Sequence, residues 1–337
     1  MRGVLRNSRS GKRAAVGRGA ICCFTLASVL FLAPAPTRAQ QRIDSAFHPT
    51  IAQPEYPAGE RPLVLVDRAH HNFHAGAGQF EQFARLLRGD GYRVRGLEER
   101  FSAKALAGAV VLVIVNAVAS REDKEWSLPT SRAFTTDEVE AVRQWVERGG
   151  SLLLIADHMP FPGAMDALAR VFGIEFLNGF AIVWQDWDPL MFHRADASLP
   201  SHPVTDGRRP GERVEHAVTF VSGSAFRALK SARCVSPLLV LGHGVVSYQP
   251  ERAWQFTDAT PRVPVEGWLQ GATLEPGRGR VAVFGEAAMF AAQLTGAKGD
   301  LVGMNSPQAS YNLQLLFNTL HWLSRAPGYG PAATRRC

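Results

Sequence analysis

The chain has 337 residues, which suits one large α/β domain or one domain with an insertion. It carries 37 Lys and Arg residues against 30 Asp and Glu residues, but residues 1–39 contain seven of the basic residues and no acidic one. The rest of the chain therefore holds 30 residues of each sign. This balance excludes an electrostatic case for binding nucleic acid or an anionic membrane surface.

The first 39 residues have the layout of a secretory signal peptide. A basic start precedes an apolar run from Ala20 to Pro34, and the small residue Ala39 offers a cleavage site. We expect cleavage after Ala39 and a periplasmic or extracellular product. An uncleaved N-terminal anchor is the alternative, although the run is short for a membrane span of about 20 residues. No later apolar run reaches that length, so we expect no membrane span in the mature chain.

Cysteine is scarce in the mature chain. Cys22 and Cys23 leave with the signal peptide, and only Cys234 and Cys337 remain. An exported protein can join such a pair in a disulfide. We instead expect Cys234 to be a small core residue and Cys337 to lie on a loose tail. Two cysteines exclude a disulfide framework and a Cys-rich metal site.

After a polar leader over residues 40–60, apolar runs predict strands and apolar residues at helical spacing predict helices. The predicted strands cover residues 63–66, 92–97, 110–115, 151–156, 237–241 and 280–284. The predicted helices lie between residues 78 and 91, at 101–106, from Thr135 to Glu147, from Pro162 to Phe172, and from Asn305 to Leu323. Thr135 and Glu138 form a capping-box signature. Strands that alternate with helices predict a parallel sheet whose strand ends share one edge.

Two stretches depart from this alternation. Residues 178–232 contain several Pro and Gly and few periodic runs, which predicts an insertion or cap, and residues 244–271 predict irregular antiparallel structure. Residues 327–337 are expected to form the tail. The main α/β domain is therefore predicted over residues 60–326.

Polar residues follow the predicted strands at their carboxyl ends, where open parallel sheets bind ligands. The buried run 151–156 lies at the centre of the pattern and ends in Asp157 and His158. Glu286 follows the last core strand and Asn116 the third. The first strand ends in a polar group consisting of Asp67, His70, His71, Asn72 and His74.

Histidine and carboxylate side chains in this mixture favour a divalent transition metal, zinc or manganese. On this hypothesis His70, His74 and His158 are the ligands, and Asp67 and Glu286 act as ligand or general base beside Asp157. No spacing matches a metal fingerprint. A metal-free polar ligand pocket and a mainly structural role for these residues remain open as alternatives.

The remaining candidates are ligand contacts. Trp184 and Trp187 form either an aromatic platform for a sugar or a packing contact between the insertion and the sheet. Nucleophilic serine catalysis and phosphate binding are disfavoured, because the chain has no G-x-S-x-G elbow and Gly76-Ala77-Gly78 lacks the rest of a phosphate-binding fingerprint. The polar candidates for ligand contact are His71, Asn72, Asn116 and Asn305.

Several segments together resemble the class I glutamine amidotransferase-like superfamily, in particular exported branches related to trehalose-utilisation-type and gliding-motility-associated domains. These segments are the first strand with its His-rich end, the region from Thr135 to Ala156, His202-Pro203-Val204-Thr205-Asp206-Gly207, and the chain from Gly285 onward. The resemblance implies a flavodoxin-like three-layer sandwich with a mostly parallel sheet and an inserted cap. Amidotransferases place a nucleophilic Cys after the strand that corresponds to 151–156. This chain has Asp157-His158 there, so glutaminase activity is not expected.

The leading hypothesis is an exported pocket enzyme, a hydrolase of a small polar or carbohydrate-derived substrate. The alternative is a non-catalytic ligand-binding or accessory module of the cell envelope. In a third interpretation, the segment 178–232 contacts a protein partner whose identity is unknown.

Overall fold

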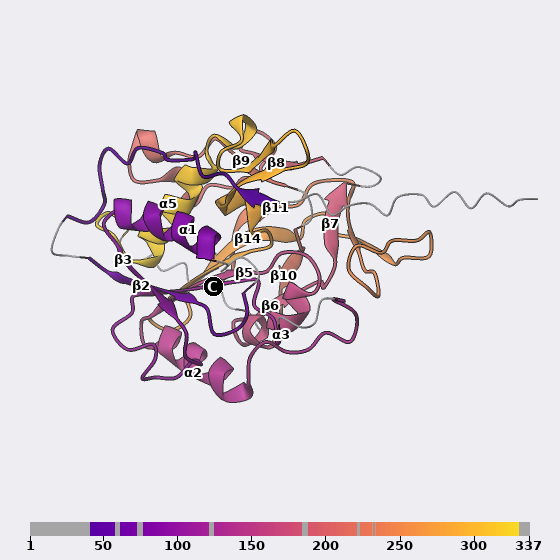
Figure 1. Cartoon of the computed structure of the whole chain (residues 1–337), viewed down its shortest axis with the longest axis horizontal. Helices are drawn as coiled ribbons and strands as arrows, with labels where there is room; N and C mark the ends of the chain where they lie inside the picture. Colours follow the sequence, from indigo (N-terminus) through magenta and orange to yellow (C-terminus); the bar gives the residue numbers. More distant parts are fainter. Residues whose placement is uncertain are drawn as a thin grey trace, which may run out of the picture. The chain divides into compact units, whose positions relative to one another are not determined.

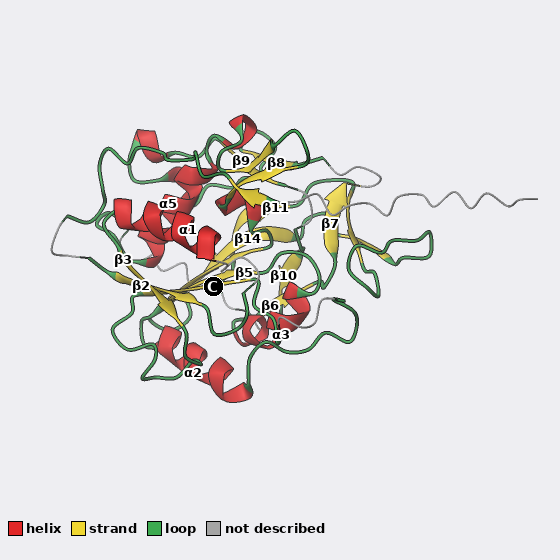
Figure 2. Ribbon diagram, viewed as in Figure 1, coloured by secondary structure: helices red, strands yellow, loops and turns green. Residues whose placement is uncertain are grey.

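The computed structural model describes residues 41–57, 61–72, 77–120, 125–183, 188–220, 223–230, 232 and 234–329. The predicted signal peptide, His74, Trp184, Trp187 and Cys337 lie outside these residues. The described residues form a mixed α/β fold built on a large mixed sheet (Figures 1 and 2). No helix among them is long and apolar enough to cross a membrane.

The large sheet is parallel in one half and antiparallel in the other. The parallel half is formed by β3 (Arg93–Leu97), β2 (Leu63–Asp67), β4 (Val111–Val115), β5 (Ser151–Ile155) and β15 (Arg280–Phe284), in this order. The antiparallel half is formed by β14 (Leu269–Leu274), β10 (Phe226–Ala228), β6 (Ile174–Phe176) and β11 (Ser236–Val240).

The expectation of a mostly parallel sheet is wrong for the described residues. Parallel neighbours need a long crossover connection, which is usually a helix. Between β6 and β14 the described chain has only the short helices α4 (Pro203–Asp206) and η1 (Pro210–Glu212). This part of the chain therefore joins the sheet through antiparallel pairing.

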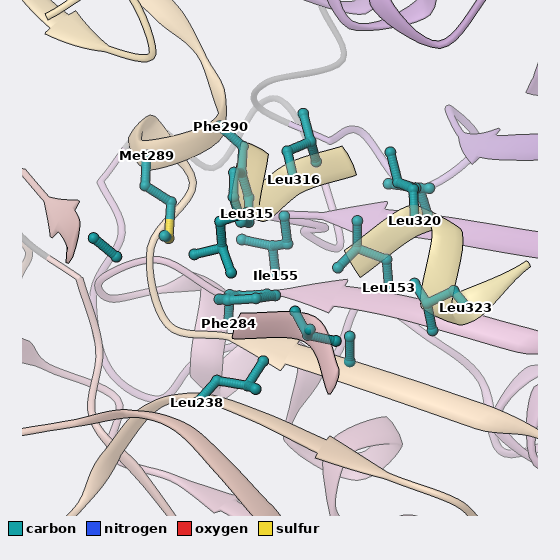
Figure 3. Packing of buried hydrophobic residues seen from close by; sticks show 14 of the residues in the cluster. Leu153, Ile155, Leu238, Phe284, Met289, Phe290, Leu315, Leu316, Leu320 and Leu323 are labelled. Atoms are coloured by element: carbon teal, nitrogen blue, oxygen red, sulfur yellow. The ribbon is translucent and has the colours of Figure 1, made fainter. Parts of the chain in front are cut away.

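Apolar side chains cover both faces of the parallel half. Along β5, Leu153 and Ile155 pack on the side of α5 (Asn312–Leu323), among Leu315, Leu316 and Leu320 (Figure 3). Leu152 and Leu154 point to the other face, where α2 (Thr136–Glu147) and α3 (Phe161–Val171) lie. Helix α1 (Ala77–Gly89) shares the face of α5 (Figure 1). Because both faces are covered, ligands can reach this half only at its edges.

Three smaller sheets complete the fold. The first contains β13 (Arg262–Pro264), β12 (Val245–Tyr248) and β7 (Phe180–Val183). The second is the pair of β8 (Leu190–His193) and β9 (His216–Thr219). In the third, β16 (Ala292–Thr295) lies between β1 (Arg42–Ile43) and β17 (Asp300–Gly303). Part of the predicted leader thus pairs with the fold, and part of the predicted insertion, β10, lies in the large sheet itself.

Three local expectations are corrected. Residues 103–108 form turns in place of the helix expected at 101–106, and the Phe101 backbone N–H donates to Glu138 Oε1 at 3.3 Å. The closing helix begins at Asn312 rather than at Asn305, because Pro307 opens the separate 3₁₀ turn η3 (Pro307–Ala309). Cys234 is exposed and disulfide-bonded, so it is not a core residue.

The segment around Arg208 joins three distant parts of the chain. Its guanidinium contacts Glu55 at 2.6 Å and Glu212 at 2.9 Å, and it donates a hydrogen bond to the carbonyl of Pro327 at 2.8 Å. Tyr329 nearby is buried, with Arg208 over its ring. The chain is therefore packed as far as Tyr329.

The capping box at the start of α2 is formed as the sequence predicts. The Thr135 hydroxyl accepts a hydrogen bond from the backbone N–H of Glu138, and the Glu138 carboxylate accepts one from the Thr135 backbone N–H. The His202 segment has the same kind of role at α4, where the His202 ring accepts from the N–H of Val204 at 3.0 Å. The motif that carries part of the family resemblance is therefore a helix cap in this chain.

Replacing Thr135 by Ala is expected to lower the free energy of unfolding by about 1 kcal/mol, the usual cost of losing such a cap. Urea denaturation of wild type, Thr135→Ala and Thr135→Ser measures the effect. The Ser variant keeps the hydroxyl and should remain close to wild type. Equal stability of the Ala variant and wild type would contradict the capping role.

Candidate functional site

The candidate site lies at the carboxyl edge of the parallel half-sheet. Strands β2, β4, β5 and β15 are direct neighbours there. Their ends present Asp67, Asn116, Asp157 and Glu286, and all four side chains are buried. The structure thus brings four of the predicted site residues to one edge of the sheet.

The centre of this edge holds two buried carboxyl groups, which we call the acid pair, Asp157 and Glu286. They are 5% and 1% exposed, respectively. Asp157 Oδ1 accepts a hydrogen bond from the N–H of His158 at 2.9 Å, and Glu286 Oε2 accepts one from the N–H of Met289 at 2.6 Å. Backbone donors from neighbouring turns therefore fix the orientation of both groups.

Burial raises the pKa of both acids. For Asp157 it outweighs hydrogen bonds from His158, Ala287 and Asn116 and raises the pKa from 3.8 to about 7. Burial also raises the pKa of Glu286 well above its ordinary value, and the negative charge of Asp157 adds to the shift. Asp157 therefore ionises first, and its charge keeps Glu286 protonated.

Asn116 links the acid pair to strand β4. Its Oδ1 accepts from the backbone N–H of Asp157 at 2.8 Å, and its own backbone N–H donates to the carbonyl of Ile155 at 2.9 Å. The backbone of Asn116 is left-handed, with a φ of 52°, and the side chain is fully buried. This geometry places Asn116 as a support for Asp157.

His158 lies in a surround of aromatic side chains. Its ring stacks on Phe180 at 4.7 Å between centroids and meets Phe161 and Trp254 at 5.4 and 4.7 Å. The Nδ1 atom lies 2.5 Å from the carbonyl of Met159. A carbonyl can only accept, so Nδ1 carries a proton, and in a neutral ring Nε2 is then an acceptor.

His70 occupies a second polar cluster on the same edge. Its Nδ1 lies 2.9 Å from Asp67 Oδ1 and its Nε2 lies 2.8 Å from Glu138 Oε1. Asn72 donates to the other oxygen of Asp67 at 2.8 Å. Burial lowers the pKa of His70, but the hydrogen bonds and charges of Asp67 and Glu138 outweigh it and raise the pKa. Through its two ring nitrogens His70 ties the end of β2 to the start of α2.

Of the three proposed metal ligands, His70 and His158 lie among the described residues. Both ring nitrogens of His70 face carboxylates, so neither points a lone pair at a metal. Among the described residues no group of three or more His, Cys, Asp and Glu side chains is placed to hold a metal ion. His74, the remaining ligand of the hypothesis, lies outside the described residues. The metal site stays a prediction.

Two further candidates for ligand contact are His71 and Asn305. His71 is half-buried with a left-handed backbone, at a φ of 50°. Asn305 donates to Asp44 Oδ2 at 2.9 Å and to the carbonyl of Gln293 at 3.1 Å, beside the small sheet of β1, β16 and β17. Their contacts with a ligand stay predictions.

Sequence reasoning missed Glu138, Phe180 and Trp254. The sequence marks Glu138 as part of the capping box. That motif alone explains why the residue is a glutamate, so it gives no hint of the contact with His70. Phe180 and Trp254 come from segments with no site motif. Only the packing of β7 and the 251–256 loop around the end of β5 brings them to His158.

No known protein-family profile matches the sequence, and no curated protein matches it. Among solved structures, the chain is similar to the mmIFT52 N-terminal domain, with a TM-score of 0.50, 12% identity, and coverage of 77% of this chain and 97% of that one. It is also similar to a putative ThuA-like protein from Bacteroides uniformis, with a TM-score of 0.46, 15% identity, and coverage of 81% and 92%. A third similar structure is that of a cytoplasmic protein from Salmonella typhimurium, with a TM-score of 0.43, 15% identity, and coverage of 78% of this chain and 98% of that one. At these identities the likeness concerns the fold alone.

Replacing Asp157 by Asn is expected to change how stability depends on pH. An acid whose folded pKa exceeds its unfolded pKa binds more protons in the folded state, so wild type loses stability as the pH rises from about 4 to about 7. Asn has no charge to bury, so the variant does not lose this stability. Between pH 4 and pH 8 its free energy of unfolding should therefore rise relative to that of wild type by up to about 4 kcal/mol. Urea denaturation at several pH values measures this difference.

The exposed carboxylate of Asp166 on α3 provides the matched control, because Asp166→Asn should show no comparable gain. A difference between Asp157→Asn and wild type that is constant over this pH range would contradict the raised pKa.

Proposed function

We propose that the protein is a hydrolase of a small polar or carbohydrate-derived substrate, with Asp157 as the general base and Glu286 as the general acid. The observation that carries this proposal is the acid pair. Two carboxyl groups are buried at the carboxyl ends of adjacent parallel strands, and both have a raised pKa. Such pairs supply acid and base chemistry near neutral pH.

The order of ionisation assigns the two roles. Ionised Asp157 takes a proton from a water molecule that attacks the substrate, and protonated Glu286 gives its proton to the leaving group. Exchange with solvent then returns both acids to their starting states. His158 follows Asp157 directly in the chain, and we propose that it helps to position the substrate beside the acid pair.

We also propose that the protein is exported and that its helices and sheet form flavodoxin-like layers. Helices α1 and α5 on one face and α2 and α3 on the other favour a flavodoxin-like arrangement for the parallel half. The disulfide of the exposed Cys234 favours an oxidising compartment, as an exported protein would meet.

A second function, a non-catalytic ligand-binding module of the cell envelope, is favoured by a different observation. Glu286 accepts hydrogen bonds from the backbone of Met289, Phe220 and Ala288. A carboxyl group held by so many backbone donors also serves to fix loops. In this alternative the acid pair shapes the site, and the ligand is bound without being turned over.

Glu286→Gln is expected to lower kcat by about 10²–10⁴-fold with little change in KM, because Gln keeps the shape of the side chain but has no acidic proton. The full chain, expressed into the periplasm, is assayed on p-nitrophenyl glycosides, esters and phosphates. Activity of wild type should follow a bell-shaped pH profile, with its lower limb near pH 7 from Asp157.

Asp157→Asn should remove the lower limb together with most of the activity, whereas Asp166→Asn should keep wild-type kinetics. Turnover that survives in both acid-pair variants would overturn the assignment. Saturable ligand binding without turnover in wild type would support the binding module instead.

A further inference from the structure

The backbone just before each member of the acid pair is held by one serine, Ser224. Its hydroxyl donates a hydrogen bond to the carbonyl of Ala156 at 2.6 Å, and its backbone N–H donates one to the carbonyl of Gly285 at 2.7 Å. Ala156 precedes Asp157 in the chain, and Gly285 precedes Glu286. Ser224 is fully buried, so both contacts are made away from water. One residue from the loop before β10 therefore ties together the two strand ends that carry the acids.

Two glycines allow Ser224 to lie this close to the strand ends. A Cβ atom at Gly285 would lie 2.3 Å from the carbonyl oxygen of Ser224, and one at Gly223 would lie 2.7 Å from the carbonyl oxygen of Gly285. Both distances are shorter than a van der Waals contact permits, so only glycine fits at these two positions. Gly223 and Gly285 thus serve the close approach of the loop to the sheet.

A buried glutamine on β14 holds the loop in this position. Gln270 Oε1 accepts a hydrogen bond from the hydroxyl of Thr219 at 2.7 Å, and the Gln270 carbonyl accepts one from the N–H of Gly285 at 2.9 Å. The Nε2 atom of Gln270 donates to the carbonyl of Ser224 at 3.4 Å. Thr219, Ser224 and Gln270 are all fully buried. The contacts of Ser224 with the strand ends therefore belong to a larger buried network of hydrogen bonds.

The peptide group that joins Ala156 to Asp157 is held on both sides. Ser224 donates to its carbonyl, and its N–H donates to Asn116 Oδ1 at 2.8 Å. The Asn116 side chain also donates to the carboxylate of Asp157, which lowers the pKa of this acid against the effect of burial. Hydrogen bonds that follow one another in a chain strengthen each other. The Ser224 hydroxyl therefore supports the ionised form of Asp157 through Asn116.

We propose that Ser224 is the positioning residue of the acid pair and fixes Asp157 and Glu286 relative to each other through the peptide groups that precede them. Its hydroxyl proton is directed at the Ala156 carbonyl and its side chain is buried, so Ser224 itself does not attack a substrate. A general acid and a general base act only when each is held within hydrogen-bond reach of its atom on the substrate. This role rests on the proposed function for the chemical step, whereas the hold on Asp157 exists without turnover.

Ser224→Ala removes the hydroxyl donor and keeps the backbone N–H. On the p-nitrophenyl substrate that wild type hydrolyses, kcat should fall about tenfold with little change in KM, because misplaced acids slow the chemical step and leave binding intact. The lower limb of the pH profile should move to higher pH, since Asp157 loses support for its ionised form. Kinetics at several pH values on the full chain, expressed into the periplasm, measure both effects.

Two further variants separate positioning from packing. Ser224→Cys keeps most of the side-chain volume but offers only a weak S–H donor, so it should resemble Ser224→Ala. Ser151→Ala is the matched control, because Ser151 at the start of β5 is also fully buried and its hydroxyl has no hydrogen-bond partner among the described residues. It should keep the wild-type kcat and pH profile. Recovery of activity in Ser224→Cys, or an equal loss in Ser151→Ala, would overturn the proposed role.

A second readout does not depend on turnover. The folded pKa of Asp157 exceeds its unfolded value, so stability falls as the pH rises from about 4 to about 8, and a further rise of this pKa enlarges the fall. The titratable neighbours Glu286 and His158 are present in all the variants. Urea denaturation at several pH values should therefore show a larger fall for Ser224→Ala and Ser224→Cys than for wild type and Ser151→Ala.

The two readouts distinguish the positioning role from the proposed function. Parallel pH dependence of stability in all four proteins would overturn the hold of Ser224 on Asp157, even if wild type is a hydrolase. A larger fall in the two Ser224 variants, without turnover by wild type, would leave that hold standing and reject the hydrolase instead.

Discussion

The carboxyl groups of Asp157 and Glu286 are buried at the ends of the neighbouring strands β5 and β15. Carboxyl groups can remain buried in this way only if they are protonated or hydrogen-bonded. The chain meets this constraint with backbone N–H groups from His158, Ala287 and Met289 and with the side chain of Asn116. Each donor comes from a turn that follows a strand. The acid pair therefore fixes the turns at the same time as the turns fix the acid pair.

The helix layers are tied to the same edge by a second charged cluster. His70 bridges Asp67 at the end of β2 and Glu138 at the start of α2, and Glu138 also closes the capping box with Thr135. One buried imidazole thus couples a strand end to a helix start. Phe101 and Phe134, with ring centroids 4.6 and 4.8 Å from His70, shield the cluster from water and strengthen its ion pairs.

Much of the parallel half of the fold follows from the sequence. Fully apolar runs such as 151–156 are typical of strands covered on both faces, and their carboxyl ends must share an edge, so Asp157, Asn116 and Glu286 could be grouped without coordinates. The antiparallel half could not be predicted in the same way. Strands β6 and β10 have three residues each, and β10 reaches the large sheet from within a stretch that has little periodicity.

The sequence by itself determined which residue types gather at the carboxyl edge, because strand periodicity and chain direction are local properties. Only the tertiary structure decided what each residue does there. Whether a histidine binds a ligand, bridges two carboxylates or packs among aromatic rings depends on partners distant in sequence: Glu138 for His70, and Phe180 and Trp254 for His158. Likewise, the raised pKa of Asp157 arises from burial beneath several segments, and burial is a property of the packed fold that no single segment carries.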